Sequence, residues 1–289
     1  MVVRMPAVAG RFYPRQPGEL AQTVRSLLAE QDASIPGHEP FPNLKGLIVP
    51  HAGYVYSGSL AAHAYSLLLP FRDRIRRVVL IGPSHYVSFP GIGITSASAF
   101  ETPLGTIPID EVSRTLEERF DFVSIRDDAH APEHSLEVQL PFLKIVLNDF
   151  HLVPLVSGRV SPQQVAEVLN DLWGGPETLI LISSDLSHFL DEATCRGTDA
   201  GTARIIENLA VSNLSTERAC GAVGIQGLML VARERGLKIS TLALKNSAEA
   251  SGDFDRVVGY GGFVLFEDDQ KTLPRQTVSS LHVSQGSAE

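Results

Sequence analysis

Histidines that follow strand-like segments are the residues of this sequence best suited to chemistry. Three apolar segments, residues 47–49, 76–82 and 178–183, each end in a short loop with a polar side chain on it. The carboxyl ends of parallel strands meet at one edge of a sheet, where ligands commonly bind. Imidazole and carboxylate groups gathered there are ligands that a metal ion requires. The side chains presented in this way are His51, His85, Asp185 and His188.

A single histidine after a strand is usually structural, with its ring hydrogen-bonded and inert. Here three of the nine histidines occupy the same place relative to a strand. If the three strands are parallel neighbours, the loops converge, and the sequence then predicts a metal site.

Two other places can supply reactive groups. Glu133 and His134 open a predicted helix, and the alternative is that they only cap it and interact with its positive end. Cys220 lies among small residues that permit close approach, although a lone cysteine is more often a small buried apolar side chain. Cys195 has neither a histidine nor a carboxylate beside it in sequence, so we assign it that buried role.

These residues leave the metal and the reaction open. Two imidazoles with a thiolate suit zinc, copper or iron, whereas two imidazoles with a carboxylate are typical of non-haem iron(II). A Ser/His/Asp hydrolase is a competing interpretation of the neighbours Ser183, Ser184, Asp185 and His188. It ranks lower, because the chain has no Gly-x-Ser-x-Gly motif and known triads draw on separate segments.

The elements that position these residues predict an α/β fold: a predominantly parallel sheet with helices on both faces and a β-hairpin excursion around Gly105. Apolar periodicity predicts the helices and strands. Pro141 is expected to break one helix, and Cys220-Gly221 to interrupt another. The predicted helices are 17–30, a segment from Ser57, 111–119, 135–147, 161–172, 194–209 and 215–235; the further strands are 150–156, 238–244 and 257–266, and residues 1–16 are expected to be irregular.

The bulk properties narrow the class of protein. The 289 residues fit one α/β domain over residues 1–266, and the polar segment 267–289 is predicted to be a disordered tail. A formal charge of −9 argues against a nucleic-acid partner. No apolar run reaches the roughly 18 residues of a membrane span. Two cysteines and an N-terminus without a secretory signal predict a cytoplasmic protein.

Six motifs of this chain occur in a characteristic order. They are Val49-Pro-His-Ala-Gly-Tyr54, Ala61-Ala-His-Ala-Tyr65, Gly82-Pro-Ser-His85, Glu133-His-Ser-Leu-Glu137, Ser183-Ser-Asp-Leu-Ser-His188 and Ala219-Cys-Gly221. Together they resemble the Memo family, and their order matches that family from about residue 4 to residue 266. The resemblance implies a three-layer α/β/α fold related to the class III extradiol dioxygenases of the LigB type, which are non-haem iron(II) enzymes.

The resemblance also implies one metal ion, held by His51, His85 and Cys220. Iron(II) is the expected metal, with copper or zinc as alternatives. The dioxygenase relatives carry a carboxylate where the cysteine stands, and the basic pair that can follow Cys-Gly in the family is replaced here by Ala222-Val223. Prokaryotic members form the AmmeMemoRadiSam system, in which this chain would be protein B and a radical-SAM protein a partner.

We therefore expect a redox enzyme with open metal positions for substrate or dioxygen. His188, oriented by Asp185, is the predicted general acid/base. His134, with Glu133 nearby, is the second proton-transfer candidate. The alternatives are a module that binds a peptide or phosphorylated ligand in a vestigial pocket, and a zinc-dependent hydrolase. The substrate, a small molecule or a peptide, is not specified by the sequence.

Overall fold

Four central strands of the computed structural model are buried along almost their whole length, as expected for parallel strands covered on both faces. The structure describes residues 2–31, 41 and 43–267. The four strands lie in the order β2 (Leu44–Val49), β9 (Thr178–Ser183), β3 (Arg77–Pro83) and β8 (His151–Ser157), and every neighbouring pair is parallel. The three strands that carry the predicted site residues are therefore adjacent, as the sequence indicated.

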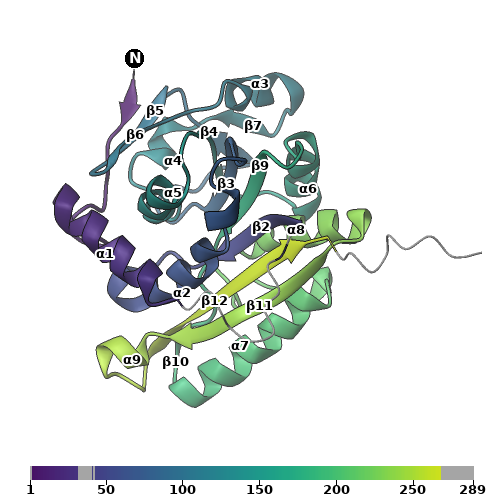
Figure 1. Cartoon of the computed structure of the whole chain (residues 1–289). Helices are drawn as coiled ribbons and strands as arrows, with labels where there is room; N and C mark the ends of the chain where they lie inside the picture. The colour runs from purple at the N-terminus through teal and green to yellow at the C-terminus, as the bar shows by residue number, and fades with distance from the viewer. Residues whose placement is uncertain (1, 32–40, 42, 268–289) are drawn as a thin grey trace, which may run out of the picture.

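Antiparallel strands extend this sheet on both sides, so the whole sheet is mixed (Figure 1). On one side, β12 (Val257–Phe266) pairs antiparallel with β2 and also with β11 (Lys238–Asn246) and β10 (His188–Leu190). On the other side, β4 (Ile92–Ile94) pairs antiparallel with β8 and parallel with β7 (Val123–Ile125). Within the described residues these form one sheet of nine strands.

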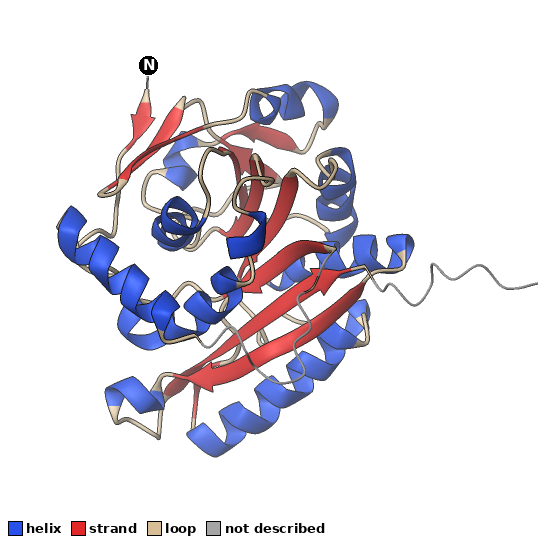
Figure 2. Cartoon of the chain, viewed as in Figure 1, coloured by secondary structure: helices blue, strands red, loops and turns tan. Residues whose placement is uncertain are grey.

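Side chains that alternate along the strands build two separate cores, one on each face of the sheet. In β9, Leu179 and Leu181 belong to the core beneath α1 (Pro17–Ala29), α2 (Tyr54–Ser66) and α5 (Leu140–Val146). Ile180 and Ile182 belong to the core beneath α6 (Pro162–Asp171), α7 (Glu192–Glu207) and α8 (Ala222–Arg235). Figure 2 shows the helices on either side of the strands. The predicted three-layer α/β/α fold is thereby confirmed.

The hairpin excursion forms a small second sheet. Strands β5 (Ala99–Thr102) and β6 (Gly105–Pro108) are antiparallel, and Gly105 has a φ of 104°, which favours glycine. The short strand β1 (Val3–Arg4) adds to β5 in parallel, where the sequence predicted an irregular segment. Two residues are too short a run to show a strand period.

Two predicted helices are shorter than expected. The segment 135–147 consists of the 3-10 turn η2 (Glu137–Gln139) followed by α5, with Pro141 in the first turn of α5, where its missing N–H costs nothing. Of the segment 215–235, only α8 is a regular α-helix, and Cys220 lies in the turn before it. The remaining elements are η1 (Leu69–Phe71), α3 (Val112–Arg119), α4 (Asp127–His130), η3 (Val211–Asn213) and α9 (Ala248–Ser251).

Two further expectations concern the C-terminal tail and membrane-crossing helices. The predicted tail lies outside the described residues except for Glu267, and the limits of the domain stay a prediction. No helix in the described part of the chain has the length and apolar character needed to cross a membrane.

Candidate metal centre

The loops that follow β2, β3 and β9 meet at one edge of the sheet. His51, His85 and Asp185 are each the second residue after the end of their strand. Because the three strands are parallel neighbours, these loops lie side by side, and the expected convergence is confirmed. A fourth loop, between α4 and η2, brings His134 to the same place.

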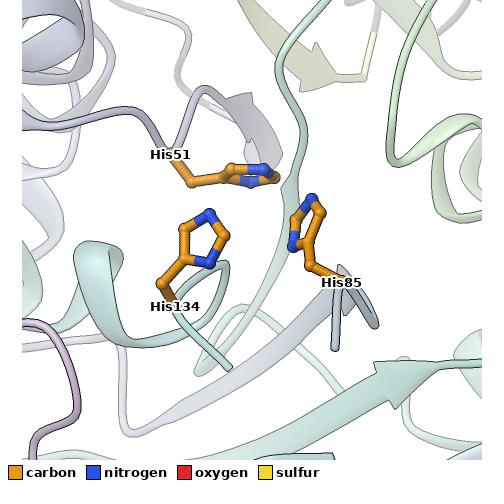
Figure 3. A group of neighbouring side chains, drawn as sticks. All are labelled: His51, His85 and His134. Atoms are coloured by element: carbon orange, nitrogen blue, oxygen red, sulfur yellow. The ribbon is translucent and has the colours of Figure 1, made fainter. Parts of the chain in front are cut away.

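Three imidazoles form the candidate metal centre (Figure 3). One potential ligand atom from each of His51, His85 and His134 lies within 4.8 Å of the other two. The ring centroids are 5.2 Å apart for His51 and His85, 5.5 Å for His51 and His134, and 4.6 Å for His85 and His134. His51 is buried, His134 is half-buried and His85 is exposed, so the group runs from the interior of the protein to its surface.

Ser183 fixes the tautomer of His51. The Ser183 hydroxyl has one proton, which it donates to the backbone oxygen of Ser135 at 2.6 Å. Its Oγ lies 2.8 Å from Nδ1 of His51 and also accepts from the Gln139 amide at 2.8 Å. Nδ1 of His51 must therefore be the donor, which leaves the lone pair of its Nε2 available for a metal ion.

Glu133 fixes His85 in the same way. Oε1 of Glu133 lies 2.8 Å from Nδ1 of His85, and Oε2 accepts from the His85 backbone nitrogen at 2.6 Å. An ionised carboxylate only accepts hydrogen bonds, so Nδ1 of His85 donates and its Nε2 carries the lone pair. This carboxylate–histidine arrangement is the usual support of a metal-binding imidazole.

The third ring, His134, is held by an aromatic neighbour and by the same carboxylate. Its Nδ1 lies 3.3 Å from the Tyr86 hydroxyl and 3.4 Å from Oε1 of Glu133. Its backbone nitrogen donates to Oε1 of Glu133 at 3.0 Å. Phe12 packs on the ring, with centroids 4.7 Å apart.

The protonation states suit a metal ion. Burial, and then the adjacent His85, lower the pKa of His51 to about 3. Burial, and then the neighbouring imidazoles, lower the pKa of His134 to about 4. Burial alone would raise the pKa of Glu133, but the hydrogen bond and charge of His85 outweigh it and lower that pKa to about 2. At neutral pH His51 and His134 are neutral and Glu133 is ionised, as metal coordination requires.

Cys220 lies beside this group. Its Sγ is 3.3 Å from Nε2 of His51 and accepts from the backbone nitrogen of Asp185 at 3.3 Å. Burial, and then the Asp185 carboxylate, raise the pKa of the thiol to about 12. Cys220 thus lies beside the predicted ligand His51, and it lines the same cavity as His85, but the group whose ligand atoms all lie within 4.8 Å of one another contains His134 in its place. Coordination by Cys220 stays a prediction.

The comparison with known proteins agrees with the motifs. The family model described as "Memo-like protein" matches residues 4–264. The chain belongs to the Memo family. A MEMO1 family protein of Thermoplasma volcanium is 34% identical, covering 91% of this chain and 98% of the relative. Relatives of the same name from Methanobrevibacter smithii and Thermotoga maritima are 34% and 35% identical, covering 91% of this chain and 100% and 99% of theirs.

The predicted acid/base pair of this Memo-family chain makes hydrogen bonds with other partners. Oδ1 of Asp185 accepts from the backbone nitrogen of His51 at 2.8 Å, so Asp185 shapes the loop that carries this candidate ligand. Nδ1 of His188 lies 2.8 Å from the backbone oxygen of Leu186. No hydrogen bond joins Asp185 to His188 within the described residues. The role of His188 stays a prediction, and its observed anchor is Leu186.

The geometry argues against the Ser/His/Asp hydrolase interpretation with Ser183 as nucleophile. Ser183 is fully buried, and its hydroxyl proton is already held by Ser135. Its histidine neighbour is His51 rather than His188. Ser183 and Gln139 are instead supports of the Memo-family site that the sequence did not reveal. The one available signal was the polar Gln139 directly before the apolar start of α5.

Proposed function

We propose that this Memo-family protein binds one iron(II) ion at His51, His85 and His134, with Cys220 adjacent, and oxidises a small organic substrate with dioxygen. One observation carries the proposal: three imidazoles surround a common point, and hydrogen bonds to Nδ1 direct the Nε2 atoms of His51 and His85 to act as ligands. The reaction class is dioxygenation, in which both oxygen atoms enter the product and no external reductant is needed.

The residues fit such an ion. Neutral imidazoles suit iron, copper and zinc, and three protein ligands leave positions open for other molecules. Glu133 supplies the carboxylate that keeps the proton on Nδ1 of His85 and orients the ring. When bound, iron(II) would supply the one-electron chemistry that dioxygen requires.

Protein groups would move the protons. His188 lies in the strand that follows the Asp185 loop and is half-buried, so its ring can exchange protons with solvent. Leu186 accepts from Nδ1 of His188 and so leaves Nε2 to take a proton from the substrate or return it. Tyr86 is exposed, adjoins His85 in the chain and contacts His134, so it lies at the surface end of the group, where the substrate would enter.

Elemental analysis of anaerobically purified protein tests the proposal. We expect iron at close to one equivalent in the wild type and its loss in H51A, H85A and H134A. H151A is the matched control, because His151 is an exposed histidine at the start of β8. Unchanged iron in H51A and H134A would reject the ligand set. Loss in C220S with full retention in H134A would favour the set His51, His85 and Cys220.

Zinc-dependent hydrolysis is the second candidate, because three imidazoles are also a donor set of catalytic zinc sites. Zinc in place of iron in the same measurement would select it. A folded protein without any metal would select the ligand-binding module. Association with a radical-SAM protein of the same system remains a separate proposal, which co-purification from the native cell can test.

A further inference from the structure

A cavity of about 500 Å³ adjoins the candidate metal centre. His85 and Cys220 both line it, together with the loop after β3 and the residues that follow β8. A cavity of this volume is within the range that accommodates small organic molecules. Any molecule inside it would lie against two of the predicted metal-site residues.

The charge of this cavity differs from that of the protein. The chain has 33 acidic and 24 basic residues, yet neither Asp nor Glu is among the described residues that line the cavity. Of the residues that the structure describes, Arg159 is the only lysine or arginine in the lining. Among the described residues, no carboxylate forms an ion pair with Arg159. The guanidinium therefore gives the cavity a positive charge that no carboxylate in the described part of the chain pairs with.

Arg159 is held in place by the loop that it faces. Its backbone nitrogen donates to the Phe89 oxygen at 2.7 Å, and its backbone oxygen accepts from Gly91 at 2.9 Å. Its side chain donates to Oγ of Ser88 at 2.5 Å. Gly158 makes this approach possible, because a Cβ there would come within 2.3 Å of the Phe89 oxygen. The guanidinium is thus exposed but anchored, and its remaining donors can bind an anion in a bidentate manner.

The rest of the lining combines apolar side chains with small hydroxyl side chains. Val87, Phe89, Val160 and Val223 contribute apolar surface to the cavity. An organic body would pack there while an anionic group bonds to Arg159.

We propose that the cavity binds a small organic anion, with a carboxylate or phosphate on Arg159 and an apolar body against the valines. That this anion is the substrate rests on the proposed function; the binding itself does not. The proposal narrows the substrate class from any small molecule to one with an acidic group.

The test is calorimetric titration of the metal-free full-length protein with benzoate, phenyl phosphate and neutral benzamide. We expect at least one anion to bind at least about tenfold more tightly than benzamide. R159Q should remove that preference and leave benzamide binding unchanged. R159K should retain part of it, because a lysine keeps the charge but loses the planar fork. R25Q, at an exposed arginine of α1, is the charge-matched control and should behave as wild type.

The two anions distinguish a carboxylate site from a phosphate site. The proposal is overturned if neither anion binds more tightly than benzamide, or if R159Q binds the anions as the wild type does. Elemental analysis of R159Q separates a failure of anion binding from a failure of the proposed function. The metal content of R159Q should equal that of the wild type, because Arg159 is not a proposed metal ligand. A wild type that takes no metal but binds an anion through Arg159 would reject the enzyme and retain the anion site.

Discussion

Nδ1 of His85 lies 2.8 Å from Oε1 of Glu133, and the backbone nitrogen of His85 donates to Oε2 of the same carboxylate at 2.6 Å. One buried acid therefore fixes both the ring and the backbone of an exposed histidine. Oε1 also accepts from the backbone nitrogens of His134 and Ser135 at 3.0 and 2.9 Å. Glu133 thus couples the positions of two imidazoles of the candidate centre.

We predict that E133Q weakens metal binding by about 10- to 100-fold, the usual effect of losing such a support. A glutamine side chain is neutral and can accept only through one oxygen, so His85 and the His134 loop compete for it. Competition with a chelator of known affinity measures the change. E118Q, at an exposed glutamate of α3, should bind metal as the wild type does. An E133Q affinity within twofold of wild type would contradict the role given to Glu133.

The sequence identified His51, His85 and Asp185 as residues that meet at one edge of the sheet if their strands are parallel neighbours. Each follows an apolar segment whose length and composition are typical of a buried strand, and topology then determines the rest. The neighbours Cys220 and Glu133 were also singled out, because small residues surround Cys220 and Glu133 opens a predicted helix.

His134 could not be assigned as a ligand from local pattern. Its loop is positioned by contacts distant in sequence: Arg4 donates to the backbone oxygen of Glu133 at 2.6 Å, across 129 residues. The tautomer of His51 likewise depends on Ser183 and Ser135, which come from different parts of the chain. Periodicity reports which face of an element is buried, but not which distant side chains meet there.

The buried ion pair between Arg4 and Glu137 should dominate the stability of the N-terminal segment. Arg4 is 7% exposed and Glu137 is fully buried. Glu137 also accepts from the Tyr13 hydroxyl at 2.6 Å and from the backbone nitrogen of Ala7 at 2.7 Å. Removing one partner leaves the other charge buried, so we predict that R4M lowers the free energy of unfolding by about 3–5 kcal/mol in urea denaturation.

The pair R4M and E137L together should cost less than the sum of the two single substitutions, because the double variant leaves no unpaired charge. R196M removes an exposed pair with Glu192 and should cost less than about 0.5 kcal/mol. Additive losses in the double variant would show that Arg4 and Glu137 contribute independently.

His130 should make stability depend on pH. Its ring is buried, its Nε2 lies 2.9 Å from the Gly93 oxygen, and its Nδ1 has no partner among the described residues. Burial lowers its pKa from 6.5 to about 4, although the hydrogen bond to Gly93 opposes the shift. Between these two values the unfolded chain binds the proton and the folded chain does not. Stability is therefore complete above about pH 6.5 and falls as the pH drops towards 4.

H130N removes this titrating group. Urea denaturation of metal-free protein at pH 7, 6, 5 and 4 should show a shallower loss of stability than in the wild type, by up to about 1.4 kcal/mol per pH unit. His51 and His134 keep their own contributions in both proteins, so the difference isolates His130. If the free energy of unfolding fell equally with pH in H130N and in the wild type, His130 would not contribute to the pH dependence. The stability of H130N at pH 7 does not affect this comparison.

The turn that carries Cys220 depends on a glycine. A Cβ on Gly221 would lie 2.7 Å from the backbone oxygen of Ser183 and 2.8 Å from Cβ of Ser184, both at the fixed end of β9. G221A must therefore push the turn away from the strand, and we predict a loss of about 1–3 kcal/mol in the free energy of unfolding. The displaced Cys220 thiol should also react faster with a thiol reagent, which C220S controls.

Gly197 in α7 is the matched control, because nothing lies within 4 Å of the position of its Cβ. Alanine is the better helix former, so G197A should raise the free energy of unfolding by about 0.5–1 kcal/mol. The two substitutions add the same methyl group. Their effects on the free energy of unfolding have opposite signs only if the backbone of β9 limits the position of the Cys220 turn. A G221A protein as stable as G197A, with unchanged thiol reactivity, would show that the turn can move freely and that Cys220 is not held beside His51.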